Sequence, residues 1–386
     1  MFTNALTRDA KTQALYAQID ERIKRGVAER DNLIERVATM VIRDKLVAPK
    51  VMDFTTVLSK ERNKLFVAYG SGHPQEEVVT IHKHALMQLC QKVNLPLSYA
   101  NMLLKDAEPW RVLLLADNLN ALFHKTEFSD RSGPPRFLHR IVGNELRGFL
   151  SRRFNRQIAS LPLLVAFVDA CNRVGAQPVD AIATDVKISL KCMLPFAFEP
   201  VPGEVISFGM EWTNSDFGAG KMKVSFCLWA PRSNRYTVLD TSISRVHIGS
   251  ILEDSDIEMS EDTAHKEAEA QSSAVRDTVN ALMQDEAVER VCGVIVRAAQ
   301  ESIPWQKLRS QFNRLLNKQE FVLLENVFEN DIVDLPPVYT NPLDGTKTPT
   351  RWWAVQALSW LASKQEDDER RLELQQAAGA FLPVVK

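Results

Sequence analysis

The side chains with the most distinctive chemistry in this sequence are the arginines between residues 131 and 156. This segment holds seven arginines and a single acid, Glu145, so that its local charge is near +6. Arginine forms paired hydrogen bonds with phosphate and stacks on nucleobases, so such a cluster beside a strand predicts contact with a nucleic acid. The alternative is that the arginines pair with the acidic run that follows Ile251, or with helices elsewhere. The seven are Arg131, Arg136, Arg140, Arg147, Arg152, Arg153 and Arg156.

Four lysines in the strands expected further along the chain extend this basic group. Lys187 and Lys191 share one face of a strand because side chains alternate between faces, and Lys221 and Lys223 share the corresponding face of another strand. In one sheet, these lysines and several arginines would form a basic surface opposite the packed face. Trp229 is expected on that surface as a stacking platform for bases. The predicted nucleic-acid-binding residues are Arg147, Arg152, Arg153, Arg156, Lys187, Lys191, Lys221, Lys223, Trp229, Arg245 and His247.

The histidines leave two interpretations open. His247, beside Arg245 in an apolar stretch, either closes the β region as a satisfied, partly buried side chain or contacts a phosphate or a base. His82 and His84 are two residues apart, and on a helix such residues point about 200° apart, so they cannot share one metal ion. We therefore expect no metal site.

The usual signatures of phosphate and acyl-transfer chemistry are missing from the sequence. There is no Gly-x-x-x-x-Gly-Lys-Ser/Thr loop, no Gly-x-Gly-x-x-Gly after a strand and no Gly-x-Ser-x-Gly elbow. The short Gly218-Ala-Gly220 sequence fits a hairpin turn better than a cofactor loop. We expect a protein without a cofactor and without catalysis, and keep an enzyme with a dispersed site as an alternative.

The elements that must position these residues are helical at both ends of the chain. Residues 9–46 lack proline and carry apolar side chains at helical spacing, which predicts a long amphipathic helix, with a break near Gly26 left open. Its apolar stripe is expected to be a packing face. Because an amphipathic helix at a terminus often needs a partner to bury its stripe, the two ends together predict a homo-oligomer. Further helices are expected over 78–92, 97–120 and 263–318, and from Thr350 onward.

Between these helical regions the periodicity changes from 3.6 to 2, after an irregular connector at 131–136. The alternation predicts strands over 185–194, 205–212 and 221–229, and the turn-rich residues between the last two predict a β-hairpin. The fold class is therefore α+β, with an antiparallel, hairpin-containing sheet packed by helices and flanked by N- and C-terminal helical regions. The expected regions are an N-terminal amphipathic helical region (1–60), an α+β core with a basic sheet (61–252), an acidic linker and helix start (253–270) and a C-terminal helical region (271–386).

Composition limits how the protein can find a charged partner. The 386 residues carry a formal net charge of only −2, so attraction to a polyanion must come from a local patch. The five cysteines are odd in number and far apart, which is typical of free thiols in a reducing compartment. No signal-peptide pattern and no apolar run of about 20 residues is present, so the cytoplasm of a bacterial cell is the expected location, without a membrane partner.

A set of short motifs, in order along residues 75–362, resembles a known family. Residues 145–156 resemble the Arg-Ala-Phe-Leu-Ser-Asp-Arg-Tyr signature of the phage- and plasmid-encoded family catalogued as domain of unknown function 932. This chain departs from that signature at Arg152, where an acid is usual, and at Phe154, where tyrosine is usual, so a role of that acid or phenol does not carry over. The other matching segments are 85–90, 95–99, Asn214-Ser215 with Gly218, 245–249 and 350–357.

The resemblance implies a mobile-element setting and not a reaction, since the family's function is unassigned. A basic-faced sheet backed by helices is also similar in outline to the single-strand annealing proteins of phage recombination. We therefore expect a phage, prophage or plasmid protein that binds single-stranded nucleic acid, DNA in the first instance, in replication or recombination. The alternative is an oligomeric interaction or assembly protein in which the basic residues merely pair with acids.

Overall fold

The computed structural model describes residues 5–56, 64–70, 77–105, 108–128, 135–151, 160–239, 261–330, 335–343 and 345–382. The fold is α+β, as the sequence predicts, with antiparallel sheets packed against helices. All five cysteines lie in the described residues and are free thiols, four of them buried. None of the helices in these ranges is long and apolar enough to cross a membrane.

Six strands of the described residues form the first sheet, which the sequence analysis missed for the most part. The strands are β1 (Ile42–Val47), β2 (Met52–Thr56), β3 (Leu65–Tyr69), β4 (Glu77–Ile81), β5 (Phe137–Val142) and β6 (Glu145–Ser151), in the order β1-β5-β6-β4-β3-β2. All neighbours are antiparallel except β4 and β6. The edge strands β1 and β2 are joined by only four residues, which span at most about 18 Å, so the sheet must curve strongly.

Three helices bury one face of this first sheet: α2 (Lys83–Lys92), α3 (Leu97–Lys105) and α4 (Pro109–Lys125). Phe123 of α4 lies at the centre of the resulting core, with its ring 5.4 Å from that of Phe54 and 5.7 Å from that of Phe149. Proline at the first position of α4 preorganises this helix, because its fixed φ suits the first helical turn.

The second sheet carries the predicted basic strands. Its order is β12-β11-β10-β8-β7, and β9 pairs with β10. The predicted hairpin is confirmed, because β10 and β11 pair antiparallel from Ser207 and Trp229 to Thr213 and Lys223. The bounds are β7 (Gln177–Ala183), β8 (Ile188–Met193), β9 (Phe198–Val201), β10 (Glu204–Asn214), β11 (Lys223–Ala230) and β12 (Arg235–Val238).

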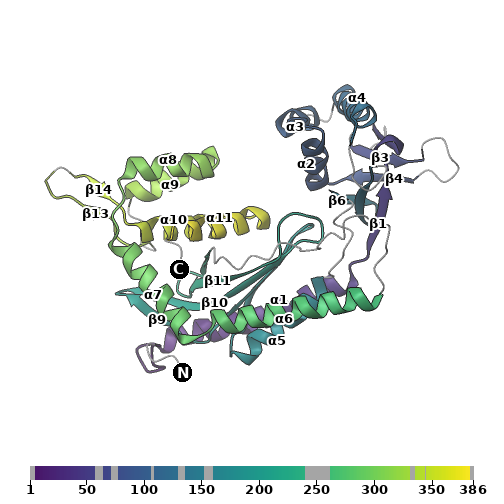
Figure 1. Ribbon diagram of the computed structural model, residues 1–386. Coiled ribbons are helices and arrows are strands. Elements are labelled where there is room, and N and C mark those ends of the chain that lie inside the picture. Colours follow the sequence, from purple (N-terminus) through teal and green to yellow (C-terminus); the bar gives the residue numbers. More distant parts are fainter. Residues whose placement is uncertain are drawn as a thin grey trace.

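Helices cover the second sheet on several sides (Figure 1). The helices α5 (Ser160–Arg173) and α6 (Glu261–Leu282) share a core with the even-numbered side chains of β8, β10 and β11, such as Leu190 and Trp212. The long helix α1 (Gln13–Thr39) runs along β7, where Gly26 touches the backbone of Pro178 so closely that a Cβ would overlap it. Helix α1 passes through Gly26 without a break.

The C-terminal helices form a separate layer beside the second sheet (Figure 1). They are α7 (Asp285–Gln300), α8 (Trp305–Leu315), α9 (Lys318–Asn330), α10 (Arg351–Ser363) and α11 (Asp368–Ala380), and a short hairpin of β13 (Tyr339–Thr340) and β14 (Lys347–Thr348) precedes α10. Every residue of α10 from Trp352 to Leu361 is buried. Trp305 stacks on Phe328 at 3.9 Å between centroids, so these aromatic side chains serve the core.

Two of the sequence predictions are wrong in detail. Residues 42–47 and 77–81 form strands where helices were expected, because β-branched runs such as Val78-Val-Thr-Ile81 favour strands and fit a helical period only by chance. The apolar stripe of α1 and the tryptophans of α10 pack within the chain, as expected of a packing face for α1. The two terminal helices therefore give no reason for self-association, which removes the basis of that prediction.

A buried histidine makes the stability of the first sheet depend on pH. His139 is fully buried on β5, its Nδ1 lies 2.6 Å from the Tyr69 hydroxyl, and burial lowers the pKa of His139 to about 3. Below pH 6.5 the unfolded chain takes up a proton that the folded chain refuses until about pH 3. The free energy of unfolding should therefore fall by up to about 1.4 kcal/mol per pH unit in that window.

Denaturant unfolding of the wild type and His139→Gln at pH 7.5, 5.5 and 4.5 measures this dependence. Glutamine can still accept the Tyr69 hydrogen bond but does not titrate, so the variant should lose this part of the slope. Equal slopes in the two proteins would contradict a neutral, buried His139.

Candidate functional site

Six of the predicted nucleic-acid-binding residues lie in the described ranges, and they do not form one surface. Arg152, Arg153, Arg156, Arg245 and His247 lie outside the described residues. The remaining six divide into a buried group, an ion-paired arginine and a group of lysines at the strand ends. Only the lysines at the strand ends still fit the basic surface that the sequence predicted.

Lys191 is fully buried, so its predicted place on a solvent face is wrong. Its Nζ lies 2.9 Å from Asp180 Oδ2 and 3.3 Å from Glu211 Oε1, and the Ser189 hydroxyl donates to the same Glu211 oxygen at 2.7 Å. Burial alone would lower the pKa of Lys191, but the two carboxylates hold it above its usual range. Alternation shows which side chains of β8 share a face, but not that another element covers that face. All residues of β8 are buried.

The pair formed by Lys191 and Asp180 continues into helix α1. Arg22 contacts Asp180 at 3.0 Å and Glu29 at 2.7 Å, and its Nε donates to the Tyr236 hydroxyl at 3.2 Å. The Tyr236 hydroxyl in turn donates to the carbonyl of Val179 at 3.4 Å, which links β12 to β7 although these are opposite edges of the sheet. We call Arg22, Asp180, Lys191, Glu211 and Tyr236 the buried polar network.

The buried polar network binds the fold together and is closed to a ligand. Burial raises the pKa of Asp180, but Lys191 and Arg22 lower it by more, so the carboxylate stays ionised. Each charge of the network meets an opposite charge inside the protein. This arrangement fixes the position of α1 on the sheet.

Trp229 is also buried, and its predicted role as a stacking platform is wrong. Its Nε1 donates to Asn234 Oδ1 at 3.1 Å, and its ring stacks on that of Tyr236 at 6.2 Å between centroids. The first half of α1 covers this region through Leu15, Tyr16 and Ile19.

Arg147 follows the alternative interpretation of the arginine cluster. Its Nε donates to Glu145 at 2.8 Å, and its Nη1 lies 3.5 Å from Asp185. Arg140 is buried, forms an ion pair with Asp44 at 3.3 Å and donates to the carbonyl of Asp216. These two arginines link the two sheets through Asp185 and Asp216, and most of the acidic run after Ile251 lies outside the described residues.

Three lysines remain at neighbouring strand ends: Lys187, Lys221 and Lys223, which we call the strand-end lysines. In the register of the second sheet Thr213 pairs with both Ser189 and Lys223, so these side chains form one row across β8, β10 and β11. Lys187 and Lys221 each lie two residues before a member of that row. Lys221 is exposed, and the other two are half-buried.

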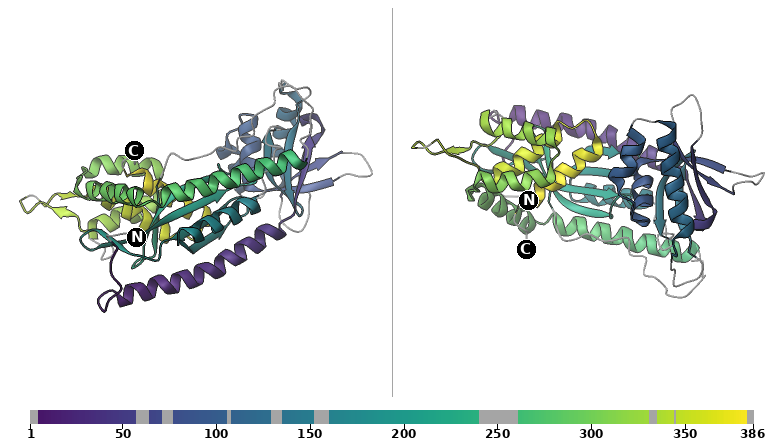
Figure 2. Two further views of the ribbon diagram at one scale, coloured as in Figure 1. Left: turned by 60° about the horizontal axis from the view of Figure 1, so that its bottom comes forward. Right: turned by 90° about the horizontal axis from the view of Figure 1, so that it is seen from above.

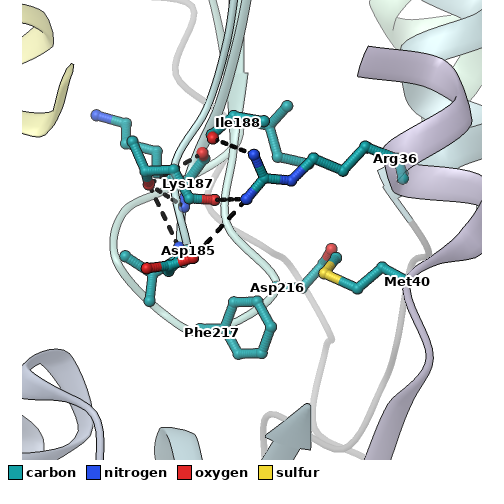
Figure 3. A pocket seen from close by; sticks show the side chains of 11 residues that line it. Arg36, Met40, Asp185, Lys187, Ile188, Asp216 and Phe217 are labelled. Carbon is teal, nitrogen blue, oxygen red and sulfur yellow. Dashed lines mark hydrogen bonds and ion pairs between the residues drawn. The ribbon is translucent and has the colours of Figure 1, made fainter. Parts of the chain in front are cut away.

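Lys187 is partly buried among charges of both signs. Burial lowers the pKa of Lys187, and Lys191 and Lys223 lower it further, against the opposing effect of Glu211 and Glu373. In Figure 3 its side chain extends away from the small pocket between α1 and β8.

That pocket is too small for a substrate. It is lined by Arg36, Met40, Asp185, Asp216 and Phe217, among others, and its volume of about 20 Å³ holds little more than one water molecule. Across the described ranges no three His, Cys, Asp or Glu side chains lie close enough together to hold a metal ion.

The loop between β10 and β11, predicted as the longer loop of a β-hairpin, also joins the two sheets. The carbonyl of Phe217 accepts hydrogen bonds from His84 Nε2 at 3.1 Å and from Gln88 Nε2 at 2.9 Å. Ser160 donates to Asp216 Oδ2 at 2.7 Å. This contact positions the strand-end lysines next to the first sheet. The only sign of the loop in the sequence is its density of polar turn residues.

Comparisons with protein-family models, with curated proteins and with solved structures found no match to this chain. The resemblance to the phage and plasmid family therefore stays a prediction from its motifs.

A substitution at Lys191 tests the burial of the network. Lys191→Met leaves Glu211 buried without its cation and Asp180 with Arg22 alone, so it should lower the free energy of unfolding by about 3–5 kcal/mol. Lys50→Met, at an exposed lysine, is the control and should change it by less than about 0.5 kcal/mol. Denaturant titration of both variants measures the free energy of unfolding. Equal effects of the two substitutions would place Lys191 in solvent.

Proposed function

We propose that the protein binds single-stranded nucleic acid, DNA in the first instance, through the strand-end lysines, without catalysing a reaction. The proposed setting is an annealing-type role in replication or recombination of a phage, prophage or plasmid in the bacterial cytoplasm. The observation that supports the binding is the gathering of Lys187, Lys221 and Lys223 at the ends of neighbouring strands. The setting rests on the motif resemblance alone.

The electrostatic argument favours a polyanion over a small anion. The net charge of −2 gives no diffuse attraction, so affinity must come from phosphates that contact local lysines and release their counterions. Three lysines spread across adjacent strands match a chain of phosphates better than a single one.

The proposal does not depend on the residues outside the described ranges. Roles for Arg152, Arg153, Arg156, Arg245 and His247 stay predictions of the sequence. Trp229 and Lys191 are no longer part of the proposed site, because both are buried.

Neutralising two of the lysines tests the proposal. Each phosphate contact to a single strand contributes about −0.7 to the slope of log affinity against log salt, so Lys187→Gln with Lys221→Gln should flatten this slope by about one unit. Charge reversal at the same two positions should abolish binding. Fluorescence anisotropy with a labelled oligonucleotide of mixed sequence, measured over a salt series, gives the slope.

The matched control is Lys50→Gln with Lys125→Gln, which removes two exposed lysines elsewhere and should leave the slope unchanged. Circular dichroism confirms that each variant is folded. Absence of binding by the wild type at about 50 mM salt, or identical slopes for test and control variants, would contradict the proposal.

A second candidate function is self-association, which we propose on an observation that the sequence analysis did not have. Two groups of large apolar side chains are exposed, one on α3 and α4 and one on the β13–β14 hairpin. A homo-oligomer would bury them, and single-strand annealing by a basic surface gains affinity when several copies act on one strand.

A further inference from the structure

The N-terminal end of α2 lies beside the strand-end lysines. The carbonyl of Phe217, in the β10–β11 loop, accepts hydrogen bonds from His84 and Gln88 of α2. Phe217 and Lys187 also line the same small pocket. Seen from above, the yellow C-terminal helices and the blue helices of the first sheet lie on either side of the ends of the teal strands (Figure 2, right). Lys83, the first residue of α2, is exposed and adds a positive charge here.

Lys83 forms an ion pair with an acid of the C-terminal layer. Its Nζ lies 3.3 Å from Glu369 Oε2 of α11, and the two side chains stay 65% and 30% exposed. A second acid of the same helix acts on Lys187: burial lowers the pKa of Lys187, and Glu373, one turn further along α11, opposes this effect. Two carboxylates one turn apart on α11 therefore act on two lysines of this region.

Helix α11 is anchored to its neighbours, so the carboxylate of Glu369 is presented from a fixed support. Arg370 donates to both carboxylate oxygens of Glu320 at 2.8 and 2.7 Å, and to the carbonyl of Leu315 at 2.9 Å. At the other end of α11, Gly379 approaches the backbone of Val238 so closely that a Cβ would overlap it. Glu369 therefore stays beside Lys83 unless the lysine side chain leaves it for another anion.

We propose that Lys83 is a fourth phosphate-binding residue of the proposed site, and that Glu369 competes with the nucleic acid for it. This inference rests on the proposed function and adds an autoinhibitory contact to it. An ion pair between exposed side chains shifts an equilibrium by at most about fivefold. A phosphate can therefore displace Glu369 without any movement of α11, and the contact lowers the affinity only by that modest factor.

A double-mutant cycle, measured by fluorescence anisotropy with a labelled single-stranded oligonucleotide, separates competition from a general effect of charge. Glu369→Gln frees Lys83 and should raise the affinity about threefold at about 50 mM salt. Lys83→Gln should lower the affinity, and by a larger factor in the Glu369→Gln background than in the wild type, because the lysine is no longer shared there. If Glu369 merely repelled the strand through its charge, the two substitutions would act independently.

The matched control is Glu325→Gln, which breaks the ion pair of 2.8 Å between Arg309 and Glu325, whose side chains are similarly exposed at 55% and 27%. This variant should bind like the wild type, because the pair joins α8 to α9. If the wild type binds, independent effects in the cycle, an unchanged affinity of Glu369→Gln or an equal gain in the control would overturn this inference alone. Binding by neither the wild type nor Glu369→Gln would overturn the proposed function together with it.

Discussion

The buried polar network is the interaction on which the arrangement of the second sheet depends. Lys191 lies between Asp180 and Glu211, and Arg22 of α1 completes the charge balance from outside the sheet. Buried ion pairs are weak evidence for net stability, because the loss of hydration offsets most of the Coulomb attraction. Their stronger effect is on specificity: a shift of α1 along β7 by one turn would leave Asp180 buried with one cation fewer. The network therefore fixes one register for α1, and α1 then covers Trp229 and the centre of the sheet.

The strand-end lysines lie next to the buried polar network, on the side of the β10–β11 loop. The row that contains Lys191 and Glu211 is sealed, and the next row towards the β10–β11 loop contains Lys223, with Lys187 and Lys221 beyond it. The loop itself is held by His84 and Gln88 of α2, so these strand ends meet the first sheet. The same alternation that places Lys191 inside the protein places the strand-end lysines at its boundary, where burial lowers the pKa of Lys187.

The sequence predicted those parts of the fold that short-range patterns determine. The hairpin of β10 and β11, the helix over most of 13–39 and the breaks at Pro96 and Pro109 follow from alternation, periodicity and turn residues. The first sheet was missed because β1 to β4 are only five or six residues long, and because β1 and β4 pair with β5 and β6, which are distant in the chain. Lys191 and Trp229 were misplaced because burial of a sheet face depends on α1, whose docking on β7 rests on Gly26 and on ion pairs across about 160 residues. A contact between residues so far apart in the chain produces no local pattern in the sequence.

Site-resolved lysine acylation is the most direct test of the central claim that the strand-end lysines bind nucleic acid while Lys191 is sealed inside. Mass spectrometry at pH 8 should show ready modification of Lys187 and Lys221, with the lowered pKa of Lys187 favouring its reaction, and none at Lys191. Saturating single-stranded oligonucleotide should protect Lys187, Lys221 and Lys223 and leave Lys50 and Lys125 as reactive as before. Unchanged reactivity of the strand-end lysines, equal protection of Lys50 and Lys125, or modification of Lys191 in the folded protein would contradict the account.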